Sequence, residues 1–114
     1  MITARQLHGV TVATVLPFHP DGRIDWASYD HLLDYCVIDR GLAAVFVNGH
    51  AGEVAALTPQ ERIEVIAHTR RRVGPGMPLL AGVVGYSTAE AVARAQEAQA
   101  AGAGAAVLFP VPQF

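Results

Sequence analysis

The strongest constraint on the fold is an apolar run that ends in a glycine-flanked loop and is followed by a helix start. Ala43–Val47 is entirely apolar, and it is followed by Asn48-Gly49-His50-Ala51-Gly52-Glu53. Thr58-Pro59-Gln60-Glu61 is typical of a helix N-terminus, with proline at the first helical position. A buried strand that runs into such a loop can present backbone N–H groups to an anionic ligand. The sequence therefore predicts the functional site in this loop.

The same alternation of apolar runs and helix signals extends along the chain. We expect strands at Gly9–Leu16, Ala43–Val47, Met77–Ala81 and Ala105–Phe109. We expect helices at Trp26–Arg40, Pro59–Val73 and Thr88–Ala101, with N-caps at Asp25, Thr58 and Ser87 and ends at Gly41, Gly74 and Gly102. The pairs Thr58 with Glu61 and Ser87 with Glu90 fit capping boxes. The order βαβαβαβ, with apolar strands, predicts an α/β fold whose parallel sheet is covered on both faces.

Composition limits the function classes. The 114 residues suffice for a single core, and 52% are hydrophobic while 16% are charged, which argues against disorder. A net charge of −2 gives no electrostatic basis for binding nucleic acid or an anionic membrane. The one basic run, Arg70-Arg71-Arg72, falls at an expected helix end, where cations are favoured. We expect it to be a solvated helix end and not a phosphate site.

Other features indicate the compartment. Cys36 is the only cysteine, which excludes a disulfide framework or a cysteine metal cluster within one chain. Val10–Leu16 is short, contains two threonines and lacks a basic leader or cleavage site, so we expect neither a secretory signal nor a membrane span. A cytoplasmic location is expected.

The strand ends should converge. Right-handed crossovers place the carboxyl ends of parallel strands at one edge, where ligands bind in barrels and open sheets. We therefore expect four segments to meet there: Pro17–Asp21, Gly49–Glu53, Gly82–Tyr86 and Pro110–Phe114. Gly82–Gly85 is too short for a nucleotide-binding fingerprint.

Three blocks of sequence resemble the dihydrodipicolinate synthase and N-acetylneuraminate lyase family. They are Pro17-Phe18-x-x-Asp21-Gly22-x-Ile24-Asp25, then Gly49-x-x-Gly52-Glu53 with Leu57-Thr58-x-x-Glu61-Arg62, then Ala81-Gly82-Val83-x-Gly85-x-Ser87-Thr88-Ala89-Glu90-Ala91. The blocks match in order and spacing, and the resemblance covers essentially the whole chain.

The resemblance implies a TIM barrel that forms a Schiff base between a lysine and pyruvate or a related 2-oxo acid, as a lyase, aldolase or dehydratase. It implies no cofactor and no metal, and a homo-oligomer, a tetramer in the family. Such a barrel has eight strands in about 250 residues. Residues 1–114 are therefore expected to be a single partial domain, the N-terminal half, with the first four strands and three helices.

The chain contains no lysine, because its eight basic residues are all arginines. A Schiff base requires a nucleophilic amine, and guanidinium stays protonated. In the family the lysine lies on the sixth strand, so we expect it in a missing C-terminal half. Residues 1–114 alone are then expected to be inactive.

The glycine loop departs from the family pattern. Family members carry two hydroxyl residues where this chain has His50 and Ala51, and the first hydroxyl belongs to a proton relay. The resemblance implies that Gly49, His50, Ala51 and Gly52 hold the substrate carboxylate, partly through backbone N–H groups. His50 is the candidate catalytic proton relay, since imidazole titrates near neutrality. The alternative is that His50 is a structural hydrogen-bonding residue, as we expect for Glu53.

The end of the fourth strand departs as well. The family has a proline and paired tyrosines, whereas this chain has Pro110-Val111-Pro112-Gln113-Phe114 without a phenol. Both departures favour a branch outside dihydrodipicolinate synthase proper, such as an aldolase or dehydratase acting on sugar-derived oxo acids.

Two other function classes stay open. His19, Asp21, His50 and Glu53 are oxygen and nitrogen donors expected at one edge, which a metal-dependent aldolase would need. Alternatively, the chain is a noncatalytic fragment that binds an oxo acid or assembles with a missing half, because unpaired strand edges favour association.

Overall fold

The computed structural model describes residues 2–110 and contains one parallel sheet. Its strands are β1 (Thr11–Ala13), β2 (Ala44–Val47), β3 (Leu79–Val83) and β4 (Ala105–Leu108), which are neighbours in sequence order. The register pairs Ala13 with Phe46, Phe46 with Leu80, and Leu80 with Ala105. Sequential parallel strands separated by helices are the arrangement of the N-terminal half of a TIM barrel. The predicted fold class is confirmed.

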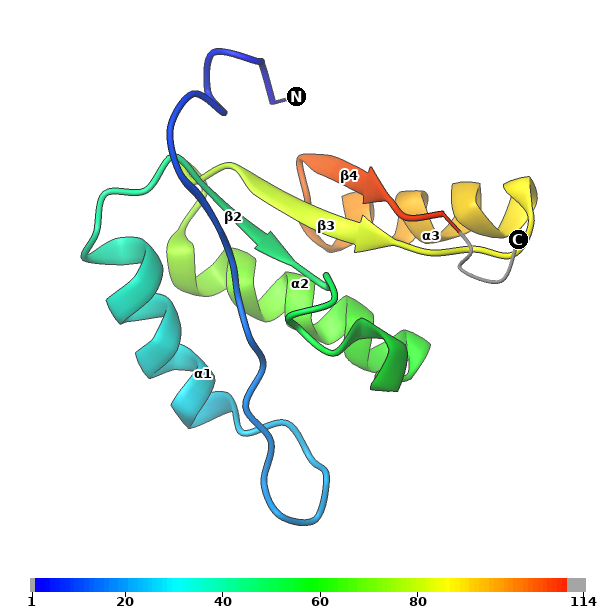
Figure 1. Ribbon diagram of the computed structural model, residues 1–114, viewed down its shortest axis with the longest axis horizontal. Helices are drawn as coiled ribbons and strands as arrows, with labels where there is room; N and C mark the ends of the chain where they lie inside the picture. Colours follow the sequence, from blue (N-terminus) through cyan, green and yellow to red (C-terminus); the bar gives the residue numbers. More distant parts are fainter. Residues whose placement is uncertain (1, 111–114) are drawn as a thin grey trace.

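The helices are α1 (Trp26–Leu33), the π-helical segment η1 (Asp34–Ile38), the short 3-10 helix η2 (Val54–Ala56), α2 (Pro59–Val73) and α3 (Thr88–Ala101). Because the strand order follows the sequence, right-handed crossovers place α1, α2 and α3 on the same face of the sheet (Figure 1). The expectation that both faces are covered is therefore wrong for this chain. In a closed barrel the second face lines the interior.

The helix starts follow the sequence signals closely. The Asp25 carboxylate accepts from Ser28 N at 3.0 Å. At α2, Thr58 and Glu61 form the complete capping box. At α3 the box is incomplete, because Glu90 N donates to Ser87 Oγ at 3.1 Å but the Glu90 carboxylate accepts from Tyr86 N at 3.0 Å. The second predicted capping box is thus corrected to a simple N-cap.

Several element bounds differ from prediction. The first strand is shorter than Gly9–Leu16, because within residues 2–110 β1 pairs with β2 alone and β2 spans only four residues. The third strand, β3, spans Leu79–Val83 and so lies later in the chain than the predicted Met77–Ala81. The helix expected over Trp26–Arg40 changes to π-helix after Leu33, where Asp39 N donates to Asp34 O at 2.9 Å. In this segment Val37 is buried while Asp34 binds Arg72 of α2.

The core lies between the sheet and the helices. Leu33 and Val37 pack there with Val45, Val47 and Leu79 from the central strands, all fully buried. Tyr29 is also fully buried, and its hydroxyl lies 2.7 Å from Thr69 Oγ1, which donates to Val65 O at 2.7 Å. Burial raises the pKa of the Tyr29 hydroxyl. This hydrogen-bonded chain fixes α1 against α2.

Two arginines of the predicted basic run hold elements together. Arg70 donates to three carbonyl oxygens, those of Gly102 at 3.0 Å, Gly74 at 2.8 Å and Met77 at 2.7 Å. Arg72 donates to Asp34 through two nitrogens, at 2.8 and 2.5 Å, and lowers the pKa of that carboxyl. The expectation of a solvated helix end holds for Arg72, which is exposed, and is wrong for Arg70, whose guanidinium is bound to three carbonyl oxygens. Among the described helices, none is long and apolar enough to cross a membrane.

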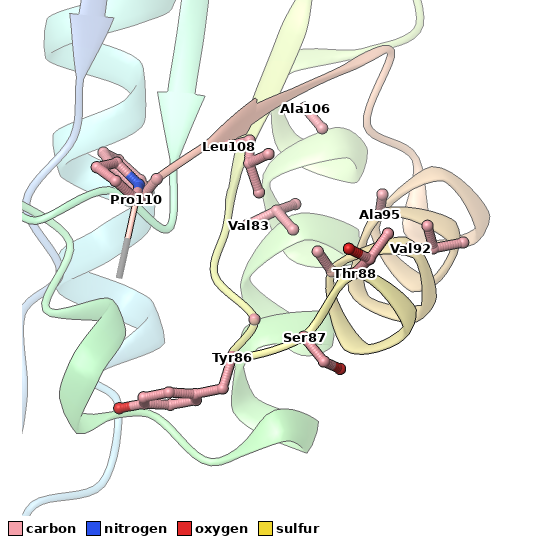
Figure 2. Close-up of a pocket in the computed structure, with 12 residues that line it drawn as sticks. Val83, Tyr86, Ser87, Thr88, Val92, Ala95, Ala106, Leu108 and Pro110 are labelled. Atoms are coloured by element: carbon pink, nitrogen blue, oxygen red, sulfur yellow. The ribbon is translucent and has the colours of Figure 1, made fainter. Parts of the chain in front are cut away.

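An apolar groove of about 680 Å³ runs between α3 and β4. Figure 2 shows Val83 and Leu108 of the strands directed toward α3, from which Thr88 and Ala95 point back. Leu108 is 65% exposed and Val92 of α3 is 50% exposed. The groove lies where the next helix of a repeating βα arrangement would pack.

Candidate active site

The carboxyl ends of the first three strands meet at the glycine loop that follows β2. A Cβ atom on Gly82 would lie 2.0 Å from the carbonyl oxygen of Asn48, so only glycine fits beside the loop. A Cβ atom on Gly52 would lie 3.3 Å from the carbonyl oxygen of Thr14, just after β1. Of the four segments predicted to converge, Gly82–Tyr86 therefore meets the glycine loop at its first residue, Gly82.

The loop has a defined backbone conformation. Asn48 and Glu53 both adopt positive φ angles, 56° and 58°. Asparagine tolerates this region better than most residues, and the Asn48 side chain donates from Nδ2 to Arg62 O at 3.0 Å. The turn closes with Gly52 N donating to Gly49 O at 3.2 Å and Glu53 N to His50 O at 3.1 Å.

Three consecutive backbone N–H groups at the loop are unpaired in the described part of the chain, and two of them belong to exposed residues. Within residues 2–110, no acceptor pairs with the backbone N–H of Gly49, His50 or Ala51. His50 and Ala51 are exposed, whereas Gly49 is buried. Successive unpaired N–H groups in a turn form a concave donor site suited to an anion. The Gly52 N–H, which the sequence analysis included, already donates within the turn.

The imidazole of His50 stacks on the ring of Phe109. The ring centroids are 4.7 Å apart and the planes differ by 21°. Phe109 follows β4 and donates its N–H to Val83 O at 3.0 Å, and its ring also lies 6.2 Å from that of Phe46. Sequence reasoning missed Phe109, whose one signal is its position between β4 and Pro110. No described residue hydrogen-bonds the His50 side chain, so stacking is what orients it.

The donors considered for a metal do not gather. Within residues 2–110, no three His, Cys, Asp or Glu side chains could hold one metal ion together. His19 Nδ1 instead lies 3.8 Å from Asp25 Oδ2, and the Asp21 carboxylate accepts from Arg23 Nε at 2.7 Å. The arrangement that a metal-dependent aldolase would need is therefore not assembled by these residues.

The other three segments predicted at this edge contribute less to the site than the glycine loop does. Pro17–Asp21 lies in a turn closed by the bond from His19 N to Arg23 O, at 2.8 Å. Tyr86 is 70% exposed and its ring points away from α3 (Figure 2). Of the segment expected after the fourth strand, Pro110 is described and residues 111–114 lie outside the described residues.

Comparison with known proteins identifies the family of the chain. A family model described as the dihydrodipicolinate synthetase family matches residues 6–112. The chain belongs to this family. It is 40% identical over 106 residues to the 4-hydroxy-tetrahydrodipicolinate synthase of Marinobacter nauticus, and 41% identical over 106 residues to that of Pseudomonas putida. Each alignment covers 93% of this chain and 36% of the relative.

A solved structure agrees with the assignment. The dihydrodipicolinate synthase of Acinetobacter baumannii, chloride-inhibited and complexed with pyruvate, superposes with a TM-score of 0.84 at 31% identity. The superposition covers 94% of this chain and 38% of that protein. The chain thus spans little more than a third of the length of these family members.

Proposed function

We propose that this chain supplies the first four strands of a barrel enzyme of the dihydrodipicolinate synthetase family that acts on pyruvate or a related 2-oxo acid. The Schiff-base lysine comes from residues beyond these 114, because the chain has none. The assembled enzyme is a lyase, aldolase or dehydratase and a homo-oligomer. The observation that carries the proposal is the row of unpaired N–H groups at Gly49, His50 and Ala51, placed at the edge where barrels bind ligands.

The loop supports binding of a carboxylate in particular. Backbone N–H groups provide hydrogen-bond donors without a side-chain charge, and the glycines permit close approach of a small anion. The family hydroxyls at positions 50 and 51 are missing, which leaves the imidazole of His50 as the proton carrier beside the carboxylate. Replacement of a hydroxyl by an aromatic base favours a family branch with sugar-derived oxo acids over dihydrodipicolinate synthase itself.

Trapping with borohydride tests whether the Schiff-base lysine comes from residues beyond these 114. We expect the 114-residue chain, incubated with pyruvate and sodium borohydride, to show no stoichiometric adduct on an internal residue by mass spectrometry. Borohydride reduces an imine, and arginine does not form one under these conditions. A longer polypeptide that continues the chain through a lysine-bearing sixth strand should take up one pyruvate. An internal adduct on residues 2–114 would refute the proposal.

The groove between α3 and β4 supports a second function, assembly of the chain with another protein segment. Leu108 and Val92 expose apolar surface there. In addition, β1 and β4 each have an unpaired edge within residues 2–110. Unpaired strand edges promote pairing with another chain. The fragment would then act through its partner and not through catalysis.

We expect the 114-residue chain to self-associate in solution because closure of the barrel is what removes strand edges. Multi-angle light scattering should show oligomers, and L108E/V92E should shift the distribution toward the monomer by charging the groove. Ile38→Glu is the matched control, since Ile38 is 46% exposed but lies on η1, outside the groove. A stable, compact wild-type monomer with cooperative unfolding would contradict this expectation.

A further inference from the structure

Three polar atoms that are unpaired in the described part of the chain belong to residues that line one small cavity beneath the glycine loop. They are Asn48 Oδ1, Arg62 Nε and Arg94 Nε, all buried and all without a hydrogen-bond partner among the described residues. The three residues line the same cavity between the loop, α2 and α3. The space open to the centre of a water molecule is about 20 Å³, whereas one bound water requires roughly 10–15 Å³. The cavity therefore has room for a single small ligand.

Two of these side chains already make other hydrogen bonds. Asn48 donates through Nδ2 to Arg62 O at 3.0 Å. Arg94 donates through one terminal nitrogen to both carboxylate oxygens of Glu97, at 3.0 and 2.9 Å. Rotating the Asn48 or Arg94 side chain to pair its buried atom would break these hydrogen bonds. Since nearly all buried polar groups in native proteins are paired, the three atoms call for a ligand.

The two donors and one acceptor determine which ligand fits the cavity. Two N–H groups donate and one amide oxygen accepts, which matches a water that accepts twice and donates once. An anion would satisfy the two arginines but would face the lone pairs of Asn48 Oδ1, and a cation would be repelled by both guanidinium groups. We propose that the cavity binds one water molecule, held by Asn48 Oδ1, Arg62 Nε and Arg94 Nε.

This water joins the start of the loop to two helices. Asn48 carries the positive φ angle that turns the chain from β2 into the loop. Fixing its side chain fixes the direction of the Gly49, His50 and Ala51 N–H groups that follow. The water site is thus a positioning element for the loop. It rests on the packing of the loop, α2 and α3, and it stands whether or not the loop binds a 2-oxo acid.

Nuclear magnetic resonance on the ¹⁵N-labelled 114-residue chain tests the site. We expect rotating-frame and laboratory-frame Overhauser cross-peaks between water and the Nε–H protons of both Arg62 and Arg94, the laboratory-frame peaks having the negative sign of a long-lived water. Adding sodium chloride should leave both resonances in place. A missing water contact at either proton, or a saturable shift with chloride, would overturn the proposal, the second in favour of an anion site.

Thermal unfolding provides a readout that does not require well-resolved spectra. Arg62→Lys and Arg94→Lys keep the charge and most of the stem but carry no N–H at the ε position. Because both arginines hold the same water, we expect the double variant to lower Tm about as much as the worse single variant, which is the mark of coupled sites. Additive losses would overturn the shared water. The control is Arg71→Lys. Arg71 is exposed and lies on α2, the helix of Arg62, so this variant should leave Tm little changed.

Discussion

Replacement of His50 by alanine is expected to lower kcat by about 100-fold in a complete barrel that carries this chain, the usual size of losing a general acid or base. The imidazole lies on the exposed tip of the loop, beside the N–H groups proposed to hold the carboxylate. Imine formation should persist, because the lysine is supplied elsewhere. Steady-state kinetics together with borohydride trapping of pyruvate measure the two effects separately.

Two further variants separate proton transfer from loop support. H50T restores the hydroxyl that the family carries at this position and should recover part of the lost kcat. F109L removes the stacked ring, 4.7 Å from the imidazole, but keeps the base. If His50→Ala raises KM and leaves kcat unchanged, His50 only supports the loop. A crystal structure with pyruvate more than about 6 Å from the loop would exclude both roles, because neither a hydrogen bond nor one bridging water spans that distance.

The features that the sequence predicts well are those set by local interactions. Asp25 and Thr58 cap their helices because a side-chain oxygen reaches an N–H only three residues away. The order of strands and helices follows from the glycine and proline residues that end the elements. The family blocks then add the barrel, which periodicity alone leaves open between a closed and an open sheet. For the same reason the position of the glycine loop at the ligand-binding edge could be predicted.

The features that the sequence could not supply depend on segments far apart in the chain. Phe109 meets His50 only because β4 lies beside β3, which in turn lies beside β2. Arg94 and Asn48 border one cavity although 46 positions separate them in the sequence numbering. The π-helical turn at Asp34 accompanies an ion pair with Arg72, a partner on another helix. None of these contacts leaves a periodic or short-range signal.

Gly82→Ala is expected to lower the free energy of unfolding by about 3 kcal/mol, at the upper end of the cost of overpacking. The new Cβ atom would lie 2.0 Å from the carbonyl oxygen and 2.8 Å from the carbonyl carbon of Asn48. Both are backbone atoms, so relief requires the loop or β3 to move and not merely a side chain. Urea unfolding followed by circular dichroism measures the change.

The matched control is Gly76→Ala. A Cβ atom at Gly76 would meet no heavy atom within 4 Å, so its effect should stay within about 0.5 kcal/mol or be slightly stabilising. Because the clash at Gly82 is with the residue that starts the loop, Gly82→Ala should also weaken pyruvate binding by a complete barrel that still folds. A variant as stable as wild type would show that Asn48 can shift away from β3. The loop would then be more mobile than its packing against Gly82 indicates.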